Sequence, residues 1–262
     1  MDLQLHDKVI LITGGAMGIG GAICKALARE GAIPVIIDKN EEASERLKSE
    51  IEAAGGRCLF LPAELSDPEA CGQTVATAAA HFGHIDGLVN NAGVNDGVGL
   101  ETGDYQRFMH SLHSNLVHYY MMAHHCLPYL KSSYGSIVNI TSKTSVTGQG
   151  GTSAYAAANG ARNALTREWA VELLKYNIRV NAIVVSECWT PQYERWIHTL
   201  PDAGATLDMI HSRIPLQNRM TTPEEIADTA IFLLSGRSGH TTGQLVYVDG
   251  GYVHLDRALI KK

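Results

Sequence analysis

Thr13-Gly-Gly-Ala-Met-Gly-Ile-Gly20 is the stretch that decides the fold. It follows Lys8-Val-Ile-Leu-Ile-Thr13, an apolar run typical of a buried parallel strand, and precedes a predicted helix over 22–30. Glycines permit a tight turn and let a phosphate approach the backbone, and a helix beginning near Gly18 offers free N–H groups. The pattern predicts a pyrophosphate-binding turn for a dinucleotide, with a glycine-rich turn that binds nothing as the alternative.

Asp38 ends the second predicted strand, 33–38, and lies 18 residues beyond Gly20. A carboxylate at this place can accept hydrogen bonds from ribose hydroxyls and repels a 2′-phosphate. The residue therefore favours NAD, while Lys39 beside it weakens the repulsion and leaves NADP possible. A solvated aspartate at a strand end is the alternative interpretation.

The strand–helix rhythm continues through the rest of the chain. It predicts right-handed crossovers and an α/β fold: one doubly wound (Rossmann) parallel sheet of about seven strands with helices on both faces. Thr222-Pro-Glu-Glu225 reads as a capping box that opens the last long helix. We expect a single domain over 1–262, with a substrate lid at about 186–219. The other predicted strands are 57–62, 85–90, 136–140, 178–185 and 244–248, and the other helices are 40–54, 67–82, 102–130 (interrupted near Pro128) and 153–175.

Composition excludes several classes of function. The 262 residues carry a net charge of −6 with no basic run, which argues against nucleic acid as a partner. No apolar run approaches the ~18 residues of a membrane span, and the N-terminus has no signal core, so we expect a cytoplasmic protein. The five cysteines are scattered without CxxC spacing, which predicts neither disulfides nor a zinc site.

Twelve histidines raise the question of a metal, because five of them fall within 110–125. His110 and His113 could share a helix face, yet no carboxylate or cysteine completes a ligand set at matching spacing. We therefore expect no metal site, and we interpret these histidines as solvated or interface residues.

The motifs together resemble the short-chain dehydrogenase/reductase family over nearly the whole chain. The turn has the spacing Thr-Gly-x-x-x-Gly-x-Gly, Asn90-Asn-Ala-Gly93 resembles the second motif, and Ser142 precedes Tyr155 by thirteen residues. Asn115, Asn181 and Asp249-Gly-Gly251 fit as well. Within the family the chain is most similar to sugar dehydrogenases of the L-fucose dehydrogenase type, on the residues Thr147-Gly-Gln149, Leu165-Thr-Arg-Glu-Trp169, Glu187 with Thr190-Pro191, and the tail 250–259.

The resemblance implies the roles of individual residues. The catalytic positions are Asn115, Ser142, Tyr155 and Asn159. A small-molecule sugar is the implied substrate, and a homotetramer joined through the helices 102–130 and 153–175 is the implied assembly. The cofactor positions are Gly14, Gly18, Ile19, Gly20, Asp38, Glu64, Leu65, Asn91, Ala92, Gly93, Tyr155, Asn159, Cys188 and Thr190, and the substrate positions are Asn95, Ser142, Gln149, Tyr155, Glu187, Trp189 and Tyr193.

The sequence departs from the family at its catalytic lysine. The family pattern is Tyr-x-x-x-Lys, but here the run is Tyr155-Ala-Ala-Ala-Asn159. Val185-Ser186 and Glu64 are lesser departures. A free tyrosine has a pKa of ~10, and the family's lysine ammonium helps its tyrosine to act as a base. Asn159 carries no charge, so we expect impaired turnover unless another cation substitutes; Lys143, expected to lie in a surface loop, is the candidate that is close in sequence.

Three interpretations therefore stay open. The first is an NAD(P)-dependent dehydrogenase that converts an L-fucose-like aldose to its lactone. The second is a nucleotide-binding protein without catalysis, for which Asn159 is the sole support. The third is a carbonyl reductase of the 3-oxoacyl type, since hydride transfer is reversible. Asn159 is compatible with natural divergence and with an introduced inactivating substitution.

Overall fold

All seven strands run parallel in one sheet, in the order β3-β2-β1-β4-β5-β6-β7, in the computed structural model, which describes residues 1–255. The predicted fold class is thereby confirmed. Parallel pairing brings every carboxyl end to one edge of the sheet, where ligands bind in such folds. The strands are β1 (Val9–Thr13), β2 (Ile33–Asp38), β3 (Leu59–Pro62), β4 (Gly87–Asn90), β5 (Ser136–Ser142), β6 (Arg179–Val185) and β7 (Leu245–Val248).

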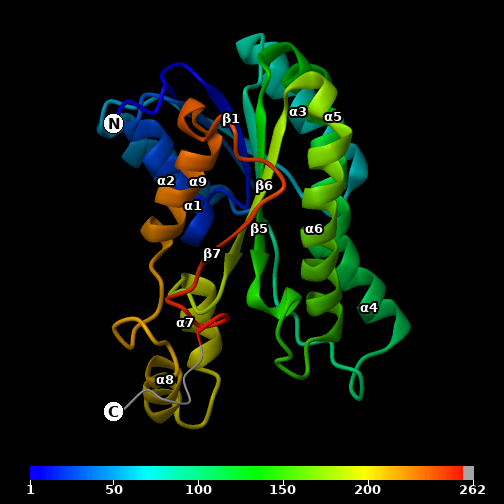
Figure 1. The fold of residues 1–262 in the computed structure, drawn as a ribbon, viewed down its shortest axis with the longest axis vertical. Helices are drawn as coiled ribbons and strands as arrows, with labels where there is room; N and C mark the ends of the chain where they lie inside the picture. The colour runs from blue at the N-terminus through cyan, green and yellow to red at the C-terminus, as the bar shows by residue number, and fades with distance from the viewer. Residues whose placement is uncertain (256–262) are drawn as a thin grey trace.

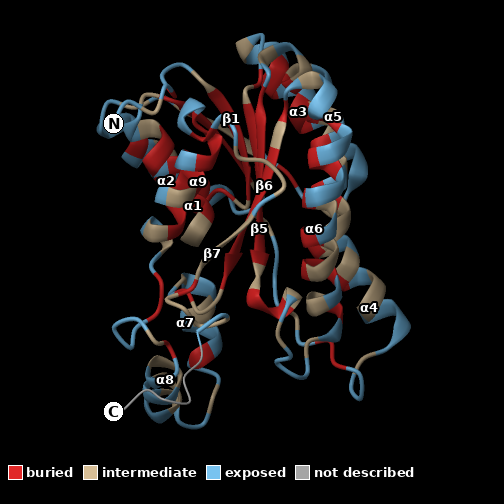
Figure 2. Cartoon of the chain, viewed as in Figure 1, coloured by how far each residue is buried: buried red, intermediate tan, exposed pale blue. Residues whose placement is uncertain are grey.

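Helices cover both faces of the sheet (Figure 1). On one face lie α1 (Gly18–Arg29), α2 (Glu41–Ala53) and α9 (Pro223–Leu234). On the other lie α3 (Pro68–Phe82), α5 (His118–Ser133) and α6 (Ser153–Glu172). Figure 2 shows buried residues along the sheet and on the inward helix faces, which explains why the central strands read as continuous apolar runs. The shorter helices are α4 (Tyr105–Leu112), η1 (His113–Val117), η2 (Lys143–Ser145), η3 (Leu174–Tyr176), α7 (Pro191–Ile197), α8 (Ala203–Ser212) and η4 (Gly236–Ser238).

The predicted helix over 102–130 is interrupted, but the prediction that the interruption lies near Pro128 is wrong. The chain forms α4, then the π-helical turn η1, then α5, which runs through Pro128 to Ser133. A π turn inserts one extra residue and leaves a carbonyl outside the regular ladder, and such turns are frequent at functional sites. η1 contains Asn115, so the irregularity coincides with a predicted catalytic position.

Residues 186–219 lie beyond the carboxyl end of β6 and hold α7 and α8 (Figure 1). Cys188 pairs with Thr221 through an isolated bridge, so both ends of the segment meet. The predicted capping box at the start of α9 is confirmed, because Thr222 and Glu225 each bond the other's backbone N–H. Among residues 1–255, no helix is long and apolar enough to span a membrane. Residues 256–259 of the tail that carried the family resemblance lie outside the described residues.

The C-terminal end of α9 is held by Arg179, the first residue of β6. Its two terminal nitrogens donate to Leu233 O at 2.7 Å, Leu234 O at 3.3 Å and Ser235 O at 3.1 Å, and also to Ser238 Oγ at 2.8 Å. These carbonyls lie at the negative end of the helix dipole, where a cation is favoured. One side chain thus joins the sheet to the helix that packs on α1.

We expect Arg179→Met to lower the free energy of unfolding by about 3 kcal/mol, because helix-end carbonyls lose charged donors. Urea denaturation at fixed protein concentration measures the change. Arg29→Met, at an exposed arginine of α1, is the matched control and should stay within about 0.5 kcal/mol of the parent. Equal effects of the two substitutions would contradict this role of Arg179.

Candidate active site

The turn after β1 has the form of an anion cradle. Gly14 and Gly18 adopt positive φ angles of 62° and 55°, which glycine tolerates best. A Cβ at Gly20 would lie 2.1 Å from Gly14 O, so only glycine fits there. Met17 makes no side-chain cap at the start of α1, and the first turn of that helix has no acidic residue. The N–H groups at the start of α1 therefore remain available to bind an anion. These observations fit a pyrophosphate.

Thr13 and Asn91 join this turn to the loop after β4. Thr13 Oγ1 accepts hydrogen bonds from Asn91 N at 2.9 Å and Ala92 N at 3.1 Å. Asn91 Nδ2 donates to Thr13 O at 2.9 Å and to Gly14 O at 3.1 Å. The two predicted cofactor motifs are therefore parts of one hydrogen-bonded unit.

Asp38 lies at the end of β2, beside the turn. Its carboxylate accepts from Ala16 N at 3.1 Å and Asn40 N at 3.0 Å. Lys39 turns instead to Glu64, with 3.0 Å between Nζ and Oε2. Partial burial disfavours the charged form of Glu64, but hydrogen bonds from Lys39 and Ser66 hold the net pKa of this carboxyl below its usual range. The lysine expected to weaken the charge of Asp38 is thus paired with another carboxylate.

Two further predicted cofactor residues occupy less polar places near these motifs. Ile19 is partly buried in α1 and packs against the core. Leu65, which follows β3, packs against the core of the other face, and its carbonyl accepts from Cys71 Sγ at 3.6 Å. Both side chains therefore pack against the core of the protein.

Asn115 lies in the π turn with no exposed surface. Its Oδ1 accepts from Val94 N at 2.8 Å, just after the Asn-Asn-Ala-Gly loop, and its Nδ2 donates to Ser111 O at 3.0 Å. Its backbone carbonyl accepts from Arg162 Nε at 2.6 Å. The side chain fixes the loop after β4, and the carbonyl faces α6.

Ser142 and Tyr155 come from the end of β5 and the first turn of α6. Ser142 Oγ accepts from Thr144 N at 3.3 Å, and Asn163 Nδ2 donates to Ser145 Oγ at 2.7 Å, so α6 is tied to the turn that follows Ser142. Both Ser142 and Tyr155 are partly exposed. A hydroxyl and a phenol on packed elements at the carboxyl edge suit proton transfer at a substrate oxygen.

Asn159 is buried and directs both described hydrogen bonds within α6. Its Nδ2 donates to Tyr155 O at 2.9 Å, and its Oδ1 accepts from Arg162 Nη1 at 3.1 Å. Sequence reasoning missed Arg162, although its spacing of three residues from Asn159 and seven from Tyr155 places all three on one helix face. The nearest buried cation along the helix is therefore Arg162.

Lys143 is not a surface residue, and that prediction is wrong. It is buried, forms an ion pair with Glu187, and lies 4.3 Å from the centroid of the Tyr252 ring. Tyr193 lies against the same carboxylate: burial first, and then the charge of Glu187, raises the pKa of its phenol. Trp189 lies near Tyr193, with 6.1 Å between ring centroids and the ring planes tilted by 45°. Of the predicted substrate residues, the structure thus gathers Glu187, Trp189 and Tyr193.

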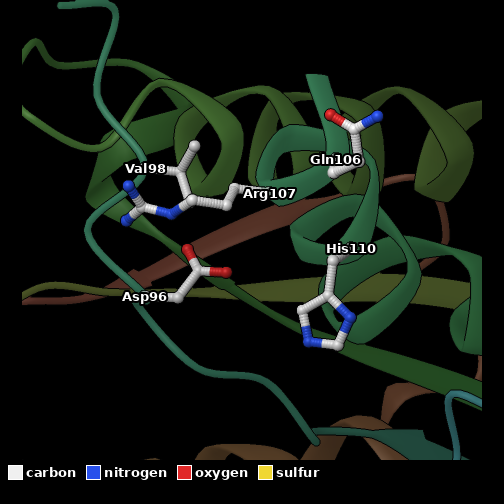
Figure 3. Close-up of a pocket in the computed structure, with 5 residues that line it drawn as sticks. All are labelled: Asp96, Val98, Gln106, Arg107 and His110. Atoms are coloured by element: carbon white, nitrogen blue, oxygen red, sulfur yellow. The ribbon is translucent and has the colours of Figure 1, made fainter. Parts of the chain in front are cut away.

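Asn95 and Gln149 are exposed and make no described contact with that cluster. Asn95 Oδ1 accepts from Gly97 N at 3.3 Å. Nearby, a hollow of about 300 Å³ opens on α4, lined by the residues of Figure 3: Asp96, Val98, Gln106, Arg107 and His110. Asp96 accepts there from Ser111 Oγ at 3.0 Å. The hollow shares no lining residue with the predicted site.

His118 departs from the expectation of a solvated or interface histidine. It is 1% exposed, and burial, with the nearby charge of Arg162, lowers the pKa of its imidazole to about 3. Within residues 1–255, no group of three or more His, Cys, Asp or Glu side chains is placed to hold a metal ion.

Thr190 brings the 186–219 segment to the glycine turn that follows β1. It caps α7, and a Cβ at Gly18 would lie 3.4 Å from its side chain. A hollow of about 290 Å³ is lined by Met17, Gly18 and Pro191, among others. Cys188 is buried, which raises the pKa of its thiol to about 12. That thiol is therefore inert packing rather than a nucleophile.

The chain matches one family model and is similar to known proteins and to solved structures. Residues 14–253 match the family model described as enoyl-(acyl carrier protein) reductase. L-fucose dehydrogenase of Mus musculus is 34% identical, over 95% of this chain and 89% of that protein. The 3-oxoacyl-[acyl-carrier-protein] reductase FabG of Thermotoga maritima is also 34% identical, over 96% of this chain and 100% of that protein. The crystal structure of Cj0485 dehydrogenase has a TM-score of 0.94 at 47% identity, covering all of both chains.

We expect Gly20→Ala to weaken NAD binding at least tenfold, because the added methyl would collide with Gly14 O and close the cradle. Isothermal titration calorimetry measures the affinity, and far-UV circular dichroism checks the fold. Gly204→Ala is the control, because a Cβ there meets nothing closer than 3.8 Å. NAD affinity equal to the parent's in the Gly20 variant would show that the nucleotide binds elsewhere.

Proposed function

We propose that this chain, which belongs to the short-chain dehydrogenase/reductase family of oxidoreductases, oxidises an aldose resembling L-fucose to its lactone with NAD. The observation that carries the substrate proposal is the buried Lys143–Glu187 pair beside Ser142, flanked by aromatic rings. Sugars are recognised by charged and polar groups that bond several hydroxyls and by rings that cover their apolar faces. The similarity to L-fucose dehydrogenase supports the same substrate class.

A nicotinamide cofactor is common to the family, and the cradle of this chain fits one. We propose that the turn Gly14–Gly20 holds its pyrophosphate, Asp38 its adenosine ribose and Glu64 with Leu65 the surroundings of its adenine. Asn91, Ala92 and Gly93 would line the path toward its nicotinamide, near Thr190 and Cys188. When bound, the nicotinamide supplies the hydride acceptor or donor.

Tyr155 is proposed as the group that takes the proton from the sugar hydroxyl. Ser142 donates a hydrogen bond to the same substrate oxygen and so fixes its position. Asn115 contributes by holding the loop after β4 through Val94. Asn159 supplies no charge to Tyr155, and we propose that turnover is therefore slower than it would be with a lysine at this position.

Glu187 is proposed to accept hydrogen bonds from sugar hydroxyls, and Lys143 to orient that carboxylate. Trp189 and Tyr193 would cover the sugar from the 186–219 segment, which acts as the lid in this proposal. Asn95 and Gln149 would contact the sugar only at the outer edge of the site, because both are exposed. A lid is suited to excluding water while the hydride moves.

A homotetramer is part of the proposal. Exposed large apolar side chains lie on the outer helices that the family resemblance assigns to subunit contacts, including Tyr105 on α4, Tyr120 on α5 and Val171 on α6. Val171 is 70% exposed in the single chain. Contiguous exposed apolar patches are characteristic of association surfaces, and we propose that these side chains contribute to one.

Reduction of a 3-oxoacyl group is the second candidate function, favoured by the similarity to the Thermotoga reductase at equal identity. The same tyrosine and serine would then give a proton and a hydrogen bond to a carbonyl oxygen. The Lys143–Glu187 pair argues against it, because an acyl chain gains nothing from a buried carboxylate. A protein that binds the nucleotide without catalysing a reaction is the third candidate function.

The first test is NADH formation from NAD across a panel of aldoses that includes L-fucose. We expect L-fucose-dependent turnover in the parent, a loss of about 100-fold or more in Tyr155→Phe, and a roughly tenfold higher KM for the sugar in Glu187→Gln. Glu194→Gln, at an exposed glutamate of α7, is the control and should match the parent.

Two outcomes would contradict this function. Turnover of an acyl thioester with NADPH but of no sugar would favour the reductase. Tight NAD binding without turnover of either substrate, in the parent and in Asn159→Lys/Arg162→Met alike, would favour the non-catalytic protein. The double variant is needed because Asn159→Lys alone would place an ammonium beside the Arg162 guanidinium.

We expect Asp38→Asn to shift the ratio of the dissociation constants for NAD and NADP about tenfold toward NADP, because the carboxylate that repels a 2′-phosphate is removed. Calorimetric titration with both nucleotides gives the ratio. Glu42→Gln, which removes one exposed charge from the first turn of α2, controls for net charge. An unchanged ratio in the Asp38 variant would place the choice of nucleotide at another residue.

A further inference from the structure

Arg162 is a buried guanidinium at the centre of the candidate site. It is 3% exposed and donates from Nε to Asn115 O at 2.6 Å and from Nη1 to Ile140 O at 3.3 Å and Asn159 Oδ1 at 3.1 Å. Its Cζ lies 4.1 Å from the centroid of the Tyr119 ring. One side chain thus contacts the π turn, the end of β5 and the helix that carries Tyr155.

The charge of this group is not matched by an anion. Its acceptors are two backbone carbonyls and a side-chain amide, and no carboxylate among residues 1–255 forms an ion pair with it. Burying a charge without a counterion is costly, so the position of this guanidinium calls for a physical explanation. By contrast, the other buried cation near the site, Lys143, is paired with Glu187.

One nitrogen of the guanidinium also lacks a hydrogen-bond partner. Nη2 is buried and donates to no described atom. A Cβ at Gly93 would lie 2.9 Å from Nη2 and 2.9 Å from Asn115 Oδ1. The free donor therefore lies against the Asn-Asn-Ala-Gly loop, at the predicted cofactor motif. The absence of a side chain at Gly93 leaves room for it.

Helix geometry places this charge on the side of Tyr155. With 3.6 residues per turn, position 162 returns to within about 20° of the direction of position 155. Side chains of a helix lean toward its N-terminus, so a long side chain at 162 reaches back toward 159 and 155. The hydrogen bond from Nη1 to Asn159 follows this direction.

We propose that Arg162 supplies, from one turn further along α6, the positive charge that Asn159 lacks, and that it stabilises the negative charge on the Tyr155 oxygen when the proton leaves. The inference rests on the proposed function, because it assigns Tyr155 as the base. Arg162 acts through space and through Asn115 and Asn159, so it is a positioning residue.

The other titratable groups near Arg162 carry no charge near neutral pH. Tyr119 packs against it from α5, the charge of Arg162 acts on His118 of the same helix, and Tyr155 lies on its own helix. Burial raises the pKa of Tyr119 and lowers that of His118 to about 3. Both are therefore uncharged near neutral pH, and neither supplies an anion to the guanidinium.

The test follows the ionisation of Tyr155 directly, in the protein without ligand. Tyrosine labelled with ¹³C at the hydroxyl-bearing ring carbon is titrated by NMR, with the signal assigned through Tyr155→Phe. We expect Tyr155 to ionise at a pH about one unit higher in Arg162→Met than in the parent. Arg162→Lys, and Asn159→Lys in the Arg162→Met background, should return it toward the parent, because each restores a cation.

Kinetics provide the second readout. The acidic limb of the pH profile of kcat should move in the same direction, with kcat at neutral pH about tenfold lower in Arg162→Met and KM for the sugar little changed. A purely structural role would lower the melting temperature without moving either pH dependence. Arg162→Gln, neutral but still able to donate to the carbonyls, serves if the methionine variant does not fold.

The proposal is overturned if Tyr155 ionises at the parent's pH in both neutral variants, or if Arg162→Lys behaves like Arg162→Met. The NMR titration needs no substrate, so it tests Arg162 equally well if no sugar is turned over. If no sugar is turned over but the titration of Tyr155 still shifts in the Arg162 variants, the role of Arg162 stands and only the proposed substrate is wrong.

Discussion

The hydrogen bonds between Thr13 and Asn91 are the constraint on which the site depends. They join the end of β4, the central strand of the sheet, to the end of its neighbour β1. Because the strands are parallel, each element that follows a strand end starts from the same edge. The glycine turn after β1, the Asn-Asn-Ala-Gly loop and the end of β5 are therefore placed relative to one another by the sheet itself. Asn115 extends the same network to α6 through Val94 and Arg162.

The parts of the molecule that sequence predicts are those encoded locally. The apolar runs of β1 and β2, the glycine turn and the capping box at Thr222 each depend on residues close together in the chain, and each forms as expected. The family resemblance also predicted catalytic roles for Ser142 and Tyr155, and these stay predictions. Local patterns are reliable where burial on both sides of a sheet leaves no choice of residue type.

Burial of charge is where sequence reasoning failed. Lys143 reads as a loop residue because its partner Glu187 lies 44 positions away. Arg162 sits in a helix rich in polar residues, and only tertiary packing shows that it points inward, onto Tyr119. The π turn at Asn115 has no local signature, since its extra residue is stabilised by contacts to other elements. Such features depend on neighbours that are distant in sequence.

The π turn also limits how the chain can change over generations. Between α4 and α5 the helix carries one residue more than a regular ladder would hold. Deleting a single residue there would let the ladder close over the carbonyl of Asn115 and rotate all of α4 by about 100° against the rest of the molecule. A deletion or insertion in this stretch therefore disturbs more of the molecule than a substitution at one of its exposed positions.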